Sequence, residues 1–285
     1  MKKYLAVLTR CRDEFYIKEW VDYYQSQNVD SIYIIDDDSN DKTIYDFVND
    51  EKYNNVDIIF ASRSYGDSNT MKNCKLDKNS QVNKLFRDKI KHSYEWLIYC
   101  DVDEFITTKK NADLTLSKQL QQINSGDIKA IGIPWVLMSG GNLKHQPTSV
   151  LKEITYRHDH DIRHFHSVRK FRCRYGAIEY KCILKPENFE YLTDHEPFPH
   201  VELHNGIDLK QTRFRNKRFI NLRNKDIDTG VFLCYHYRYI SDQNAKNKLQ
   251  TNGWYINDGY TFEDLKTSTY PEIHDNTMLK KIHDQ

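Results

Sequence analysis

A run of apolar and aromatic residues, 96–100 (WLIYC), leads directly into residues 101–105 (DVDEF). The run predicts a buried β-strand. Two carboxylates, Asp101 and Asp103, then leave its carboxyl end, which is where open α/β sheets place their ligands. Carboxylates bind hard divalent cations, and such cations hold the phosphates of nucleotides. The stretch therefore predicts a metal and nucleotide site built on Asp101 and Asp103.

The first half of the chain alternates strand-like and helix-like patterns. Strand-like runs occupy residues 4–8, 32–35, 56–60, 96–100 and 130–133. Between them lie four groups of apolar residues at helical spacing. The first is Ile17, Trp20, Val21 and Tyr24, and the last is Leu116, Leu120 and Ile123. Of the two between, Ile44, Phe47 and Val48 follow a possible cap at Asp41, and Val82, Leu85, Phe86 and Ile90 follow one at Asn79 or Ser80. This rhythm predicts an α/β fold with a mostly parallel central sheet flanked by helices.

The second half of the chain is less regular. Strand-like segments are expected around residues 151–156, 167–174 and 177–184, whereas residues 186–230 are polar and poorly patterned. From Asp242 onward the pattern is weakly helical and highly charged. No internal repeat or linker is apparent, so we expect one domain over residues 1–285.

Composition narrows the class of protein. A net charge of +1 over 285 residues provides no field that would attract nucleic acid or a membrane surface. No stretch approaches the roughly 20 apolar residues of a membrane span. The apolar run at the start is short and is followed by Arg10 and Arg12, which indicates a first strand rather than a signal peptide. The six cysteines form no C-x-x-C pair, which predicts reduced thiols and a cytoplasmic location.

A second acidic cluster, residues 36–39 (DDDS), closes the second predicted strand. It is either a helix cap or a source of a carboxylate that binds the base or ribose of a nucleotide. The glycine-rich dinucleotide and P-loop patterns are absent, so a metal held by carboxylates is the expected phosphate anchor. The D-x-D pattern also opens haloacid dehalogenase phosphatases, but their motif follows the first strand and lacks a residue like Phe105 in fifth place.

Together these residues resemble the GT-A glycosyltransferases, and within them family 92 and its family 2-type bacterial and viral relatives. Residues 12–20 resemble an R-N-E…E-W opening in which Asp13 replaces the usual Asn. Residues 29–41 and 96–105 resemble the acidic turn and the D-x-D-E-F block. Weaker matches are residues 133–135, residues 181–186, and His236-Tyr237 with Ser241; the Lys that often precedes this Ser is missing.

The resemblance implies transfer of a hexose from a UDP-sugar to a glycan acceptor, with inversion. It divides the domain into a nucleotide-sugar and metal half (1–135), an acceptor half (136–240) and a C-terminal helical segment (241–285). Asp103 would ligate Mn²⁺ or Mg²⁺, Asp101 would contact the metal or ribose, and His236 would complete the metal shell. The expected donor site comprises Thr9, Arg10, Arg12, Glu14, Asp36, Asp37, Asp101 and Trp135.

Two of these residues have an alternative interpretation. His236 lies between tyrosines and is either a metal ligand or a packed histidine. Trp135 is either a core residue or an indole that packs on the acceptor sugar.

An inverting enzyme needs a general base, and a carboxylate usually serves. We expect it between Trp135 and His236. Asp194 and Glu196 are the first candidates because they lie in a turn bounded by prolines, and Glu179 and Glu202 are the reserves.

Residues 158–166 hold four of the 12 histidines: His158, His160, His164 and His166. They form either a separate zinc site or a loop that faces solvent or the acceptor. No cysteine flanks them at zinc-finger spacing, and Arg157, Arg163 and Arg169 would repel a cation. The loop is therefore the expected interpretation.

Two other functions remain open. A nucleotidyltransferase also holds metal on carboxylates, but it would offer a Gly-rich or basic phosphate loop after the first strand, for which residues 9–12 are a thin substitute. A non-catalytic glycan-binding relative would be expected to lose the metal carboxylates, and this chain keeps both.

Overall fold

The computed structural model describes residues 2–61, 78–123, 126–162, 164, 177–212 and 220–283. The strand expected at residues 167–174 lies outside these ranges. Within them, no helix has the length and apolar character needed to cross a membrane.

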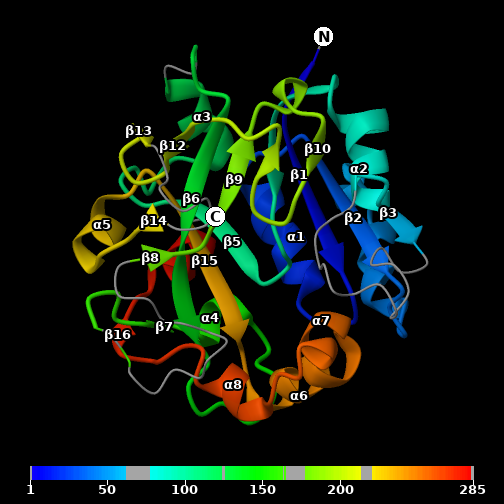
Figure 1. Ribbon diagram of the computed structural model, residues 1–285. Helices are drawn as coiled ribbons and strands as arrows, with labels where there is room; N and C mark the ends of the chain where they lie inside the picture. Colours follow the sequence, from blue (N-terminus) through cyan, green and yellow to red (C-terminus); the bar gives the residue numbers. More distant parts are fainter. Residues whose placement is uncertain are drawn as a thin grey trace.

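Twelve of the described strands form one sheet, whose main path runs β13-β12-β6-β9-β4-β1-β2-β3 (Figure 1). The half of this sheet that contains the first four strands is parallel. Strand β1 (Lys3–Cys11) lies between β2 (Ser31–Asp37) and β4 (Tyr94–Tyr99), and β2 also pairs with β3 (Val56–Ala61). All four strands were predicted from apolar runs. Because they are parallel, the acidic residues that follow β2 and β4 leave the same edge of the sheet.

The other half of the sheet is mixed. Strand β9 (Tyr180–Leu184) is antiparallel to both β4 and β6 (Ala130–Ser139). Strand β15 (Phe232–Tyr239) runs parallel to β6 and antiparallel to β5 (Glu104–Thr108). The predicted α/β class with a central sheet is thus confirmed, and its antiparallel pairs lie in the second half of the sheet.

The alternation of side chains along β1 explains how helices cover both faces of the sheet. Leu5 and Val7 belong to the same core cluster as helix α1 (Ile17–Ser26), whereas Ala6 and Leu8 belong to the cluster that contains helix α2 (Gln81–Leu85). Helix α1 is also tied to β5, because the buried indole of Trp20 donates a hydrogen bond to the Glu104 carbonyl at 3.1 Å.

Two local expectations need correction. The short helix expected after Asp41 is a 3₁₀ helix, η1 (Thr43–Asn49). Its Ile44, Phe47 and Val48 pack against the core as predicted, but the buried residue is Tyr45, whose hydroxyl reaches Asp36 Oδ1 at 2.7 Å. Residues 151–156 were expected to be a strand but include a short helix, α4 (Val150–Glu153). Glu19 accepts the backbone N–H of Val150 at 2.8 Å and so stabilises the start of that helix. Only β7 (Tyr156–Arg157) is extended there.

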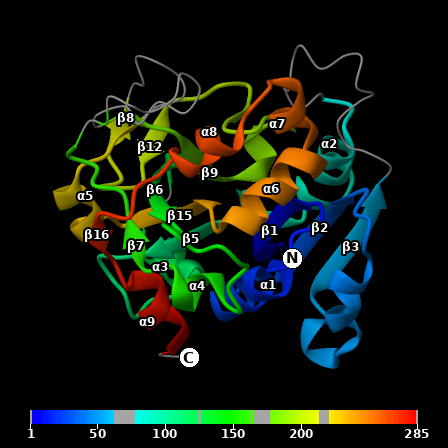
Figure 2. The ribbon, with the colours of Figure 1, turned by 90° about the horizontal axis from the view of Figure 1, so that it is seen from below.

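The predicted helical character of the C-terminal segment is confirmed by α6 (Asp242–Thr251), α7 (Gly253–Asn257) and α8 (Phe262–Lys266). The hydroxyl of Ser241 caps α6 by accepting the Asn244 N–H at 3.1 Å. Figures 1 and 2 show these helices, in orange, beside the ends to which β1 and β15 point. The C-terminal segment therefore returns to the edge of the sheet where the acidic residues emerge.

Ser80, one of the two predicted caps, begins α2 by accepting the Asn83 N–H. The remaining described elements are η2 (Glu51–Tyr53), η3 (Phe86–Ile90), α3 (Leu116–Gln122), β8 (Ala177–Ile178), η4 (Pro186–Asn188), β10 (Tyr191–Leu192), β11 (Pro197–Phe198), β12 (Leu203–Asn205), β13 (Gln211–Thr212), β14 (Ile220–Asn221), α5 (Asn224–Thr229), β16 (Ile273–His274) and α9 (Thr277–His283).

Candidate active site

Asp103 lies in the turn between β4 and β5 and is contacted from two C-terminal elements. Its Oδ1 is 3.5 Å from Nε2 of His236 on β15, and its Oδ2 is 2.7 Å from Nζ of Lys248 on α6. The backbone fixes this arrangement, because the Tyr237 N–H donates to the Asp103 carbonyl at 2.8 Å. The structure thus brings together Asp103 and His236, which the sequence analysis placed in one site.

The charge states of Asp103 and His236 suit a ligand pair. Burial would raise the pKa of Asp103, but Lys248 and His236 hold it well below its usual range. Burial lowers the pKa of His236, and the attraction of Asp103 only partly opposes this. Nδ1 of His236 is buried without a hydrogen-bond partner among the described residues. A carboxylate and a neutral imidazole, 3.5 Å apart at the end of a sheet, fit a divalent transition metal.

Asp101 faces different partners. Its Oδ2 is 2.7 Å from Nζ of Lys181 on β9, and its Oδ1 is 3.8 Å from the Arg10 guanidinium. Burial would raise the pKa of Asp101, but Lys181 and Arg10 lower it. Lys181 also lies 3.5 Å from the buried carboxylate of Glu104. The carboxylate of Asp101 therefore faces the two cations Lys181 and Arg10, whereas that of Asp103 faces the cation of Lys248 on one side and the imidazole of His236 on the other.

The end of β1 contributes the other residues that we expected near the donor. Thr9 is buried, and its hydroxyl donates to the Arg10 carbonyl at 3.2 Å. Nε of Arg12 is buried without a hydrogen-bond partner among the described residues. Glu14 accepts from Asn244 Nδ2 of α6 at 3.4 Å. Burial raises the pKa of Glu14, Lys248 opposes this, and the nearby Asp103 adds to it.

The acidic turn after β2 divides its roles between structure and site. Asp36 is fully buried and contacts Tyr45, Lys42 and the Ser39 N–H, so it supports the turn itself. Asp37 is only half-buried at the end of β2. Asp13 has a positive φ of 53° and accepts hydrogen bonds from the backbone and side chain of Asn40, at 2.7 and 2.8 Å. It thereby joins the loop after β1 to the acidic turn.

The strand predicted at residues 130–133 would end before Trp135, but β6 extends to Ser139, so Trp135 lies inside it. Its side chain is buried, and its ring centroid is 4.3 Å from that of His236. The guanidinium of Arg238 lies 5.2 Å over the same indole. Nε1 of the indole has no hydrogen-bond partner within the described part of the chain. Trp135 is therefore a packed residue that also borders the candidate site and orients His236.

The two leading base candidates lie in different surroundings. Asp194 Oδ1 is 3.0 Å from the Arg10 guanidinium, which also approaches Asp101. Glu196 is bound by the Tyr180 hydroxyl at 2.5 Å and by Nδ1 of His200 at 2.9 Å.

The reserve candidates lie elsewhere. Glu179 Oε2 is 3.7 Å from Arg238, and the Glu202 carboxylate accepts from Gln211 on β13. Asp194 is therefore the candidate that the structure links to Asp101.

Two buried lysines of the site were missed by sequence reasoning. Lys181 interrupts the otherwise apolar strand β9 and is 2% exposed, and such an isolated charge was a signal that could have been used. Burial would lower the pKa of Lys181, but Asp101 and Glu104 together outweigh it and raise this pKa well above the usual value. Lys248 lies in a helix rich in polar residues, where one more lysine gives no signal.

An α/β sheet with carboxylates at its parallel strand ends is the architecture of nucleotide-sugar transferases of the GT-A type. The model of glycosyltransferase family 92 matches residues 12–281, and the chain belongs to this family. None of the curated proteins compared with the chain matches it.

Solved structures show a distant likeness. TarS 1-349 of S. aureus in complex with UDP-GlcNAc is 20% identical over 54% of this chain and 39% of that chain, with a TM-score of 0.34. A second crystal structure of S. aureus TarS 1-349 is 17% identical over 65% of this chain and 47% of that chain, with a TM-score of 0.36. HddC from Yersinia pseudotuberculosis is 13% identical over 80% and 98%, with a TM-score of 0.34. The chain thus spans less than half the length of these TarS structures.

Proposed function

We propose that this chain transfers a hexose from a UDP-sugar to a glycan acceptor, with Mn²⁺ or Mg²⁺ bound at Asp103 and His236. The observation that carries the proposal is the meeting of these two side chains, 3.5 Å apart, at the strand ends of a family 92 chain. When bound, the cation would neutralise charge on the departing nucleoside diphosphate. The imidazole in the ligand set favours Mn²⁺.

The fixed cations of the site support binding of a charged donor. Lys181 and Arg10 hold Asp101 as a carboxylate, and an ionised Asp101 can accept hydrogen bonds from a ribose. Arg12 adds a guanidinium just after β1, with its Nε buried, and Asp37 is the half-buried acid that ends β2. Because Asp36 is buried and Asp37 is only half-buried, we assign recognition of the base or ribose to Asp37 and support of the turn to Asp36.

The acceptor step requires a base. In the proposed inverting reaction the acceptor hydroxyl attacks the sugar carbon from the side opposite the leaving group and passes its proton to Asp194. Two observations favour Asp194 over Glu196: it is joined to Asp101 through Arg10, and the two oxygens of Glu196 are bound by Tyr180 and His200.

The decisive experiment is a panel of nucleotide sugars incubated with the full chain and Mn²⁺, scored for release of nucleoside diphosphate without any acceptor. We expect turnover of one or more UDP-hexoses that stops when the metal is chelated. Asp103→Asn should abolish it, and Asp113→Asn, an exposed acid elsewhere, should not. Turnover that survives both chelation and Asp103→Asn would remove metal dependence from the proposal.

A further inference from the structure

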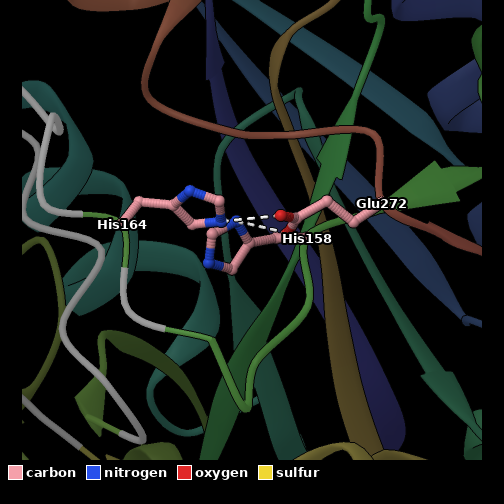
Figure 3. A group of neighbouring side chains, drawn as sticks. All are labelled: His158, His164 and Glu272. Carbon is pink, nitrogen blue, oxygen red and sulfur yellow. Dashed lines mark ion pairs between the residues drawn. The ribbon is translucent and has the colours of Figure 1, made fainter.

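A second cluster of metal-ligating side chains lies apart from Asp103 and His236, where β7 meets β16. His158, His164 and Glu272 bring three ligand atoms within 4.8 Å of one another (Figure 3). Among the residues that the structure describes, no other group of three His, Cys, Asp or Glu side chains does so. The cluster takes no part in the proposed transfer reaction.

The spacing of the three ligand atoms is close to that of a tetrahedral zinc site. His164 Nε2 lies 2.7 Å from Glu272 Oε1, and His158 Nδ1 lies 3.6 Å from Glu272 Oε2. Ligand atoms about 2.0–2.1 Å from zinc stand roughly 3.3 Å apart in a tetrahedron. Small side-chain rotations therefore suffice to place an ion between them.

His158 offers a buried nitrogen to this space. The side chain is 3% exposed, and Nδ1 has no hydrogen-bond partner in the described part of the chain. A buried polar atom without a partner is costly, and a metal ion would satisfy it.

The backbone and neighbouring rings hold the ligands in place. Strand β16 pairs with β7 so that Ile273 lies opposite Arg157, which puts Glu272 beside His158. The Asp159 N–H donates to Glu272 Oε2 at 2.8 Å and orients this carboxylate. The His164 ring stacks on Tyr270 with centroids 3.9 Å apart. Such outer contacts are typical of metal ligands.

Of the three arginines that the sequence set against a cation, only Arg157 lies within the described residues. Its guanidinium is buried and faces Asp275, with Nε 3.2 Å from Oδ2, so this acid offsets part of its charge. The expectation of a solvated loop is wrong for His158 and His160, which are both buried; His160 Nε2 accepts the Leu137 N–H at 3.3 Å. His166, Arg163 and Arg169 lie outside the described residues.

We propose that His158, His164 and Glu272 form a second metal site, which binds Zn²⁺ and is distinct from the donor site. Two imidazole nitrogens with one carboxylate suit zinc and exclude Ca²⁺ and Mg²⁺, which prefer oxygen ligands. The ion joins the segment after β7 to the segment before β16 and so anchors the C-terminal end of the chain to the sheet.

The test is equilibrium dialysis of the full chain against Zn²⁺ alone, with metal content per chain as the readout. We expect one tightly bound Zn²⁺ that survives Asp103→Asn. Glu272→Gln and His164→Ala should each weaken it by about 100-fold or more, beyond the 10–100-fold cost of losing an outer contact. The matched control is His274→Ala, an exposed histidine on β16 two residues after Glu272, which should bind as the wild type does.

Thermal unfolding gives a second readout that is independent of activity. Zn²⁺ at 100 times its Kd should raise the Tm of the wild type by about 5 °C and leave that of Glu272→Gln unchanged. Near-UV circular dichroism confirms that each variant is folded, and His164→Ala replaces Glu272→Gln if the latter is not. The absence of tight binding, equal binding by the variants and the wild type, or binding that disappears only with Asp103→Asn would each overturn the proposal.

Discussion

Lys248 Nζ lies 2.7 Å from Asp103 Oδ2, although the two residues are 145 positions apart in the sequence. Helix α6 thus brings a buried ammonium to the carboxylate that we propose as a metal ligand. Burial would lower the pKa of Lys248, but Asp103 and Glu14 raise it, so the ammonium stays charged. His236 approaches the other oxygen of Asp103, Oδ1. A metal ion bound between His236 and this oxygen would neutralise the carboxylate from one side, and Lys248 neutralises it from the other.

The first prediction follows from this shared carboxylate. Lys248→Met removes the cation and leaves Asp103 partly buried with only His236 beside it. We expect the metal-free protein to lose about 3–5 kcal/mol in free energy of unfolding, as when a buried ion pair loses one member. Added Mn²⁺ should then raise the Tm of the variant more than that of the wild type, measured by thermal unfolding. Lys246→Met, exposed on the same helix, is the control. Equal Mn²⁺ effects in variant and wild type would show that the ion does not bind at Asp103.

The second prediction concerns His236. His236→Gln removes the imidazole that meets Asp103 Oδ1 and leaves a side chain of similar length. We expect the Mn²⁺ concentration for half-maximal activity to rise about tenfold or more, as measured by a metal titration at saturating donor. His204→Gln on β12 should leave this concentration unchanged. If both variants titrate like the wild type, His236 is a packed residue of β15.

The sequence predicted the parallel half of the fold well, because an apolar run such as 96–100 indicates a buried strand without any knowledge of which elements cover it. It predicted the site less completely. The meeting of Asp103 with Lys248 depends on where α6 docks, and no local pattern encodes that. Strand β15 contains His236 between tyrosines and was not recognised as a strand, since its polar residues obscure a segment that is nearly all buried.

The histidine-rich segment shows a different limit. Its residues suggested a polar loop, but the pairing of β7 with β16 brings Glu272 to His158 and buries that histidine. Only the fold supplies the carboxylate that turns two histidines into a candidate metal site.

The third prediction separates the acids of the turn after β2. Asp37→Asn should weaken UDP binding by about 1–3 kcal/mol, the cost of losing a hydrogen bond to a charged group, and leave stability unchanged. Asp36→Asn should instead lower the free energy of unfolding, because Asp36 is buried and bonded to Tyr45 and Lys42. Calorimetric titration with UDP and urea unfolding measure the two effects. The reverse pattern would assign nucleotide recognition to Asp36.

The fourth prediction concerns the base. Asp194→Asn should lower kcat for transfer to the acceptor by about 10²–10⁴-fold, the usual contribution of general base catalysis. The Kd for the UDP-sugar should change little. Glu196→Gln should have a smaller effect on kcat, because Tyr180 and His200 already occupy its carboxylate. If Glu196→Gln is the more damaging of the two, the base assignment must be exchanged.

The last prediction concerns the buried ion pair of Arg157 and Asp275 and how its contribution to the free energy of unfolding changes with pH. Arg157 Nε lies 3.2 Å from Asp275 Oδ2, and each side chain is 5% exposed. Burial would raise the pKa of Asp275, but hydrogen bonds from Thr277 and the charges of Lys109 and Arg157 lower it. A carboxyl group whose pKa is lower in the folded than in the unfolded protein stabilises the fold fully at any pH above its pKa in the unfolded protein, which is about 3.9. That contribution is lost as the pH falls through the lower, folded pKa.

Asp275→Asn should therefore cost about 3–5 kcal/mol at neutral pH, because it leaves Arg157 buried without its anion. The difference in free energy of unfolding from the wild type should shrink as the pH falls below about 4, as measured by urea unfolding across the acid range. Asp228→Asn is the control, because the Asp228 side chain is 71% exposed and its ion pair with Lys109 is long, at 4.0 Å. A difference for Asp275→Asn that stays constant with pH would show that the ionised carboxylate does not stabilise this end of the chain.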